Sequence, residues 1–195
     1  MDETTHDLVL YARNANVRIK NEDPKRIKLV SGAFLDHDTL DEAMHGVDLV
    51  YLNDMGNVGA VRHIIETMQA NHVKLIICAS ILGIYDEVVG KFGEWNDQMI
   101  GSSPRNQDQK DSAAIVEESG LDYIILRLTW LYNDESNEDY AFTKKGEAFV
   151  GAQVTREAVA RAIVDLIEST EEKHPTESLG IYQPGSEHLE KPFFY

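Results

Sequence analysis

The sequence has little of several features that mark large classes of protein. Its 195 residues include one cysteine, Cys78, which excludes an internal disulfide framework and fits a reducing compartment. No stretch approaches the ~20 apolar residues of a membrane span, and no apolar run follows a charged start as in a signal peptide. We therefore expect a cytoplasmic protein without a membrane partner.

Basic residues are scarce, since 18 Lys and Arg against 34 Asp and Glu give a net charge of −16 at pH 7. This balance argues against a nucleic-acid partner, because phosphates need a basic face. Six basic residues nevertheless lie close together: Arg13, Arg18, Lys20, Lys25, Arg26 and Lys28. This basic corner either receives an anion or forms a solvated loop.

Glycine is absent before Gly32, and only five residues precede His6. Nucleotide-binding sheets normally begin with a strand, a glycine-rich turn and a helix whose backbone N–H groups bind phosphate. Without this turn and helix, the sequence shows no standard site for the phosphates of a nucleotide.

The sequence does contain short, nearly continuous apolar segments that are rich in branched residues. They lie at 7–12, 27–34, 47–53, 73–80 and 122–128. Continuous apolar runs are typical of strands buried on both faces of a parallel sheet. The pattern therefore predicts five such strands.

Helical patterns separate most of these segments. Apolar residues share one stripe in 58–71 and in 107–119, and Asp38 is placed to cap a short helix before Gly46. The clearest helix is 155–169, with Thr155 as its cap. Alternating strands and helices predict an α/β fold, a doubly wound parallel sheet in three layers. The length fits one domain over 1–195.

Two segments depart from this alternation. Residues 140–154 alternate around Lys145-Gly146 and predict a hairpin. With the helix that follows, it would form a substrate-side extension over 140–170. The acidic stretch 133–139 is interpreted as a solvated loop, and we expect no metal site.

Ligands of open α/β sheets bind beyond the carboxyl ends of the strands. Arg13 follows the first segment, where an arginine pairs with the 2′-phosphate of NADP and an acid would accept the 2′-hydroxyl of NAD. Asp36 follows the second, where a side chain reaches the adenine, although a helix cap is the alternative role. We expect NADP as the cofactor, with NAD as the alternative.

Ser80 ends the fourth segment, at the carboxyl edge of the predicted sheet, and Tyr85 follows five residues later. Hydride transfer to a carbonyl needs a proton donor beside the carbonyl oxygen. A tyrosine hydroxyl serves if a nearby cation lowers its pKa, and a serine holds the substrate oxygen. The alternative is a polar strand end followed by a surface aromatic.

The chain resembles the atypical short-chain dehydrogenases/reductases, most of all their NmrA-like, NAD(P)H-binding branch. Some members of this branch are labelled saccharopine-dehydrogenase-related or NAD-dependent epimerase/dehydratase-like. The resemblance covers roughly 6–170 and is carried by "LVLYAR" (8–13), "GIYDE" (83–87) and "SGLDYIILR" (119–127). It implies a Rossmann-like fold.

The resemblance also implies roles for single residues. Leu52 and Asn53 would line the cofactor cleft, and Ser80 would face the nicotinamide. Lys110 lies near a helix position where relatives keep a lysine, so it joins Ser80 and Tyr85 as a candidate catalytic residue.

The sequence departs from the family at its catalytic residues. The superfamily's tyrosine and lysine lie four residues apart on a helix, and the only such pair, Tyr140 and Lys144, falls in the predicted hairpin. Arg127 matches the arginine of the family's "ILRP", but Leu128 replaces the proline. A full reductase triad is not visible, so catalysis is an open question.

The family begins with the glycine-rich strand, turn and helix, so the resemblance implies that the first strand and helix are missing. A start codon assigned too late or a fragmentary gene would explain this, and a working protein without the motif is the alternative. Loss of a central strand would leave the edges of 7–12 and 47–53 unpaired, which favours a homo-oligomer.

We interpret the chain as an NAD(P)-dependent oxidoreductase that acts on an unidentified small molecule. Two alternatives stay open. One is a non-catalytic NAD(P)-binding sensor that regulates partners, and the other is an inert truncated fragment.

Overall fold

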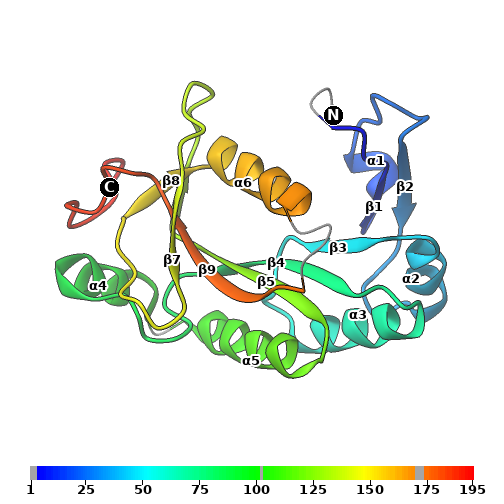
Figure 1. Ribbon diagram of the computed structural model, residues 1–195, viewed down its shortest axis with the longest axis horizontal. Helices are drawn as coiled ribbons and strands as arrows, with labels where there is room; N and C mark the ends of the chain where they lie inside the picture. Colours follow the sequence, from blue (N-terminus) through cyan, green and yellow to red (C-terminus); the bar gives the residue numbers. More distant parts are fainter. Residues whose placement is uncertain (1–3, 102, 170–173) are drawn as a thin grey trace. The chain divides into compact units, whose positions relative to one another are not determined.

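A computed structural model describes residues 4–101, 103–169 and 174–195 (Figure 1). The chain divides into two compact units. The first comprises Met1–Val50 and Gly59–Lys74, and the second comprises Tyr51–Val58 and Leu75–Tyr195. The single domain expected over 1–195 stays a prediction, and each unit is described by itself.

The first unit contains a two-stranded parallel sheet and three helices. Its elements are β1 (Leu8–Ala12), α1 (Ala15–Arg18), β2 (Ile27–Ser31), α2 (His37–Met44) and nearly all of α3 (Val58–Ala70). Leu8 lies opposite Ile27 in the sheet, and Ala12 lies opposite Ser31. β1 uses one edge for this pairing, and among the described strands none pairs with its other edge. This is the open edge that the sequence predicts for 7–12.

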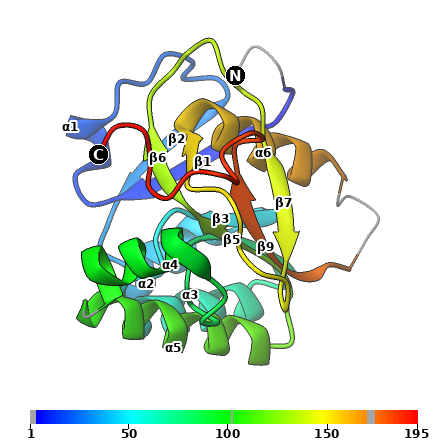
Figure 2. The same cartoon turned by 90° about the vertical axis from the view of Figure 1, so that its left-hand side faces the viewer.

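A five-stranded sheet has the order β3-β4-β5-β9-β7, so β3 also lies at an edge, and all of it belongs to the second unit except the first half of β3. The strands are β3 (Leu49–Leu52), β4 (Leu75–Ile81), β5 (Asp122–Leu128), β9 (Thr176–Tyr182) and β7 (Ala141–Lys144). β4, β5 and β9 are parallel, and β7 runs antiparallel beside β9 (Figure 2). Ser80, Arg127 and Gly180 occupy the same level of neighbouring strands.

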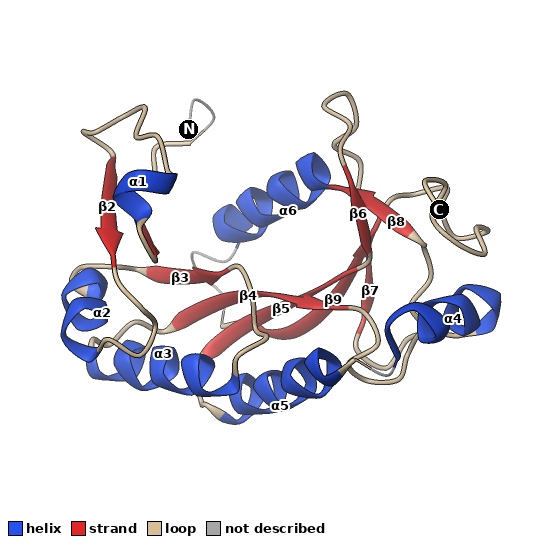
Figure 3. Cartoon of the chain, turned by 180° about the vertical axis from the view of Figure 1, so that it is seen from behind, coloured by secondary structure: helices blue, strands red, loops and turns tan. Residues whose placement is uncertain are grey.

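Helices cover both faces of this sheet, as expected for a three-layer fold (Figure 3). α5 (Pro104–Glu118) lies on one face and α6 (Arg156–Ser169) on the other. Apolar side chains of α6 pack against buried residues of the sheet, such as Ile77, Ile124 and Leu179. Thr155 caps α6 as predicted, because its hydroxyl accepts the N–H of Ala158 at 2.9 Å. α4 (Gly90–Asn96) continues into a π-helical segment, Asp97–Gly101.

Three features differ from the sequence-based expectations. The hairpin predicted for 140–154 is wrong, because β7 pairs with β9 while β8 (Gln153–Thr155) pairs in parallel with β6 (Trp130–Tyr132). Strand alternation reveals a strand but not its partner. The strand β9 was not predicted at all. The cap of α2 is Asp36 rather than Asp38, because the Asp36 carboxylate accepts the N–H of Thr39 at 3.3 Å.

Candidate functional site

Ser80 stands at the carboxyl end of β4, as the sequence predicts, but its side chain is nearly buried. The residue is 3% exposed, and its hydroxyl donates a hydrogen bond of 3.0 Å to Oε1 of Gln109. Gln109 lies on α5 and is 1% exposed. The strand end is therefore tied to the helix that covers it.

The side chain of Gln109 also bonds a residue of the loop after β3. Nε2 of Gln109 donates to Oδ1 of Asp54 at 3.1 Å. The same oxygen accepts the backbone N–H of Gly56 at 2.8 Å and Nη2 of Arg105 at 2.8 Å. Arg105 lies in the first turn of α5. We call Ser80, Gln109, Asp54 and Arg105 the edge network, because it follows the carboxyl edge of the sheet.

Gly56 is required where the edge network turns. A Cβ atom there would lie 3.1 Å from Oδ1 of Asp54 and 3.2 Å from Cζ of Arg105. These separations are tighter than ordinary van der Waals contact, so a side chain would displace both polar groups. The space beside this glycine is thus occupied by side chains of the chain itself.

Tyr85 lies in a second polar group, away from Ser80. Its hydroxyl donates to Glu117 at 2.7 Å, and Nζ of Lys145 pairs with the same carboxylate at 2.6 Å. Lys145 also lies 4.3 Å from the centre of the Tyr85 ring. Burial raises the pKa of Tyr85 above its ordinary value of 10.0. A tyrosine that donates a proton needs a lowered pKa, whereas the pKa of Tyr85 is raised. The catalytic role of Tyr85 therefore stays a prediction.

Arg127 lies beside this second group, with its guanidinium carbon 5.5 Å from the centre of the Tyr85 ring. It is fully buried and pairs with Glu87 at 2.7 Å. Its Nη2 atom also donates to the carbonyl oxygens of Thr143 and Ser178, each at 3.3 Å. Glu87 accepts the backbone N–H groups of Gly83 and Tyr85 as well. The pair therefore joins the loop after β4 to three strands of the unit.

The other predicted residues of the second unit are dispersed. Lys110 pairs with Asp86 at 2.7 Å, and within the described ranges no hydrogen bond joins Lys110 to Ser80 or Tyr85. Leu52 is buried, and Asn53 is exposed and accepts the hydroxyl of Tyr51 at 3.0 Å. Burial raises the pKa of Tyr51 to about 12. The structure thus brings Ser80 into a network, and among the described residues no hydrogen bond or ion pair joins the three candidate catalytic residues to one another.

In the first unit, Arg13 is exposed directly after β1. The next residue, Asn14, has φ of 56° and begins α1. Asp36 is exposed after β2, where it caps α2, so the alternative role stated for it is the one observed. The adenine contact of Asp36 and the phosphate contact of Arg13 stay predictions.

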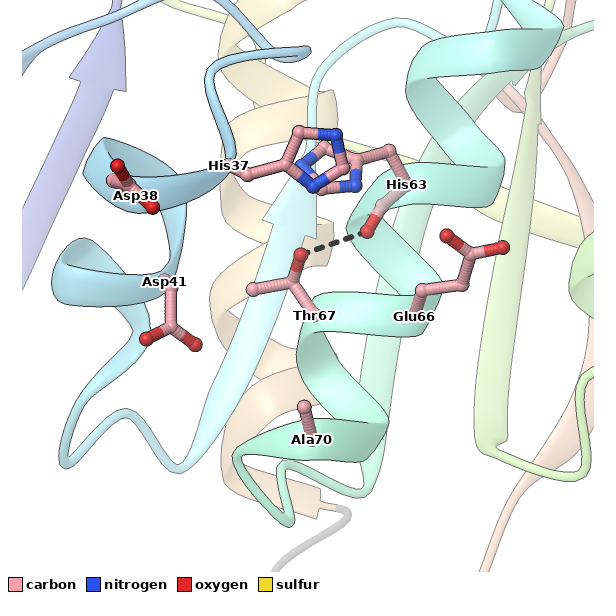
Figure 4. Close-up of a pocket in the computed structure, with 7 residues that line it drawn as sticks. All are labelled: His37, Asp38, Asp41, His63, Glu66, Thr67 and Ala70. Atoms are coloured by element: carbon pink, nitrogen blue, oxygen red, sulfur yellow. Dashed lines mark hydrogen bonds between the residues drawn. The ribbon is translucent and has the colours of Figure 1, made fainter.

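The first unit also contains a cavity of about 320 Å³ between α2 and α3 (Figure 4). The rings of His37 and His63 meet there with their centres 3.8 Å apart. His63 is 6% exposed, and among the described atoms neither of its ring nitrogens has a partner. Asp38, Asp41 and Glu66 supply carboxylates around the cavity. Burial, and next the neighbouring His37, lower the pKa of His63.

The described residues contain neither a membrane-spanning helix nor a cluster of metal ligands. No helix there is both long and apolar enough to cross a membrane. In the same ranges no group of three or more His, Cys, Asp or Glu is placed to hold a metal ion.

Sequence reasoning missed most of the edge network. Asp54, Arg105 and Gln109 stand in segments that carry no motif, and Gln109 is adjacent to Lys110, which was chosen instead. One available signal was Gln109 itself, because a polar residue on the apolar stripe of a buried helix needs a hydrogen-bonding partner.

Comparisons with known proteins agree with this fold. A family model described as NAD(P)H-binding matches residues 1–170. No curated protein matches the chain. A solved structure of a short-chain dehydrogenase/reductase from Veillonella parvula in complex with NADP is 30% identical with a TM-score of 0.89, and the match covers 95% of this chain and 86% of that one.

A second solved structure supports the same assignment. A Rossmann-fold NAD(P)-binding family protein from Shigella flexneri is 32% identical with a TM-score of 0.75, and the match covers 96% of this chain and 85% of that one. The Rossmann-like fold and the resemblance to the atypical branch are thereby confirmed. The chain belongs to the NAD(P)H-binding family of Rossmann-fold proteins, among the short-chain dehydrogenases/reductases.

Proposed function

We propose that the protein is an NADP-dependent oxidoreductase acting on a small molecule. The observation that carries the proposal is the edge network, which lies where ligands of parallel sheets bind. Membership of the NAD(P)H-binding family supports the cofactor class. The relative from Veillonella parvula, crystallised with NADP, supports the choice of NADP.

Arg13 is the residue proposed to select NADP. It is exposed at the carboxyl end of β1, and within the described ranges no hydrogen bond or ion pair engages its guanidinium. A guanidinium binds a phosphate through charge-assisted hydrogen bonds, which NADH does not offer at its 2′-hydroxyl.

The residues near Ser80 are proposed to orient the reacting groups. When bound, the cofactor supplies the hydride, and the chain supplies position and protons. Ser80 is proposed to face the nicotinamide, held by Gln109. Tyr85 is proposed as the proton donor, which requires its hydroxyl to leave Glu117. Lys110 would assist only after leaving Asp86.

A second candidate function is a cofactor sensor without catalysis. The observation that favours it is the engagement of two candidate catalytic residues elsewhere, because Tyr85 bonds Glu117 and Lys110 pairs with Asp86. A sensor needs the cofactor site but no aligned proton donor.

Calorimetric titration with NADPH and NADH tests the proposal. NADPH should bind more tightly by roughly 1.5–3 kcal/mol, the worth of a hydrogen bond to a charged group. Arg13→Ala should remove most of this preference, whereas Arg18→Ala, a matched change on α1, should leave it.

Turnover separates the two candidates. Oxidation of bound NADPH by model quinones or aldehydes supports the enzyme, and binding without oxidation supports the sensor. Equal affinities for NADPH and NADH would overturn the role of Arg13.

A further inference from the structure

The edge network has a buried end and an exposed end. Ser80 and Gln109 are 3% and 1% exposed. The side chains of Asp54 and Arg105 are 53% and 58% exposed. A ligand that reaches this edge of the sheet therefore meets Asp54 and Arg105 first.

The exposed end of the network offers a ligand both a hydrogen-bond acceptor, on Asp54, and hydrogen-bond donors, on Arg105. Oδ1 of Asp54 accepts three N–H groups, from Gly56, Arg105 and Gln109. No described residue bonds Oδ2 of Asp54, and Arg105 contacts Asp54 through a single Nη2–Oδ1 hydrogen bond. Nε and Nη1 of Arg105 have no partner among the described residues. The two side chains, which meet through Nη2 and Oδ1, thus keep one carboxylate oxygen and several guanidinium N–H groups that no described residue bonds.

We propose that Asp54 and Arg105 bind an amide group of the ligand. The ligand N–H would donate to Oδ2 of Asp54, and its C=O would accept from the guanidinium of Arg105. An amide carries an adjacent donor and acceptor without net charge, which suits a site of this kind. Asp54 would repel a carboxylate, and Arg105 would repel a cation.

Two sources offer this chemistry, namely the carboxamide of the nicotinamide and a lactam in the substrate. The first source rests on the proposed function, because it requires the cofactor at this edge. The second requires only that a lactam reaches the site.

Gln109 and Ser80 are positioning residues for this site. Oδ1 of Asp54 already accepts from Gly56 and Arg105, so the amide group of Gln109 must turn Nε2 toward it. Oε1 of Gln109 then faces Ser80 and accepts its hydroxyl proton. The buried end thereby helps to hold Oδ1 of Asp54 as the oxygen that the internal donors use, which leaves Oδ2 for a ligand.

Asp54→Asn is the sharpest test, because it keeps one oxygen for the three internal donors and turns the outward acceptor into a donor. The probes form two matched pairs. NADPH is compared with its 3-acetylpyridine analogue, which has no amide N–H, and 2-pyrrolidinone with N-methylpyrrolidinone. Affinities for the dinucleotides are measured by calorimetry, and lactam binding by the NMR shift of the Gly56 amide.

Wild-type protein should bind the N–H-bearing member of at least one pair roughly tenfold or more tightly, as for a hydrogen bond to a charged acceptor. Asp54→Asn should bring that ratio close to one. Asp165→Asn, a matched change in the surface pair with Arg161, should leave it unchanged. If Asp54→Asn does not fold, Arg105→Gln replaces it and should weaken the same ligand.

The outcomes separate this inference from the proposed function. Discrimination between the dinucleotides supports the nicotinamide source, and discrimination between the lactams alone supports the substrate source. Failure of both dinucleotides to bind overturns the proposed function, while a lactam shift at Gly56 would still support the amide site. Equal binding within both pairs, or no lactam shift and no dinucleotide discrimination, overturns the amide site.

Discussion

The second unit contains two arginine–carboxylate pairs of nearly equal length and very different surroundings. Arg127 and Glu87 lie 2.7 Å apart with side chains 0% and 4% exposed. Arg105 and Asp54 lie 2.8 Å apart with side chains 58% and 53% exposed. The chemistry of the contact is the same, so the difference between the two pairs is a difference in access to water.

Burial gives the two pairs different roles. The buried pair has lost its hydration and compensates with hydrogen bonds to Gly83, Tyr85, Thr143 and Ser178. The exposed pair keeps its hydration and leaves polar atoms unbonded, so water screens it but a ligand can reach it. Placement in the fold therefore decides whether such a pair holds strands together or stays open to solvent.

The largest effect should follow from breaking the buried pair with Glu87→Gln. The charge of Arg127 would be left buried without a counter-charge, at a cost of about 3–5 kcal/mol in the free energy of unfolding. Urea denaturation measures the loss. A loss below 1 kcal/mol would mean that water reaches Arg127 in solution.

A smaller effect should follow from Tyr85→Phe. The variant removes the hydrogen bond to Glu117 but keeps the ring beside Lys145, so we expect a loss of about 1 kcal/mol by urea denaturation. Tyr140→Phe, which removes a hydroxyl bonded to Asp165, is the matched control. A loss of turnover with unchanged NADPH affinity would add a catalytic role for Tyr85, and unchanged turnover would exclude one.

The exposed pair should contribute less still. Asp54→Asn makes the same acid-to-amide change as Glu87→Gln, but we expect a loss of only about 0–1 kcal/mol, as for surface ion pairs. Measured in the same denaturation series, the two variants compare the pairs directly. Equal losses would show that exposure does not distinguish them.

The smallest effect on stability should come from the protonation of His63 in the first unit. The pKa of His63 lies below its ordinary value of 6.5, because burial and His37 disfavour the imidazolium. The unfolded chain therefore takes up the proton first as the pH falls. Stability should be flat above about pH 6.5 and decline below it. Denaturation of wild type and His63→Gln between pH 5 and 8 checks this, and identical profiles would contradict it.

The sequence predicted the regular part of the fold well. The segments at 7–12, 27–34, 47–53, 73–80 and 122–128 became β1 to β5, because runs of branched apolar residues favour strands. The predicted burial on both faces holds for most of β4 and β5 but not for β1, where Leu8 and Val9 are exposed. Cys78 is fully buried, as expected for a residue in the middle of such a run. Ser80 stands at the end of β4 for the same reason.

The edge network could not be predicted in the same way. Asp54 and Arg105 are 51 positions apart, and Ser80 and Gln109 are 29 apart, so no local pattern links them. Nor does the sequence link Tyr85 with the residue that its hydroxyl bonds, because Glu117 is 32 positions away.

By itself, the amino-acid order determined which segments become strands and helices, because periodicity and capping act over a few residues. The tertiary structure alone decided that β7 pairs with β9 instead of β8, and that Arg127 is buried while Arg105 is not. These outcomes depend on which distant surfaces exclude water from one another, and that free energy belongs to the packed chain rather than to any segment of it.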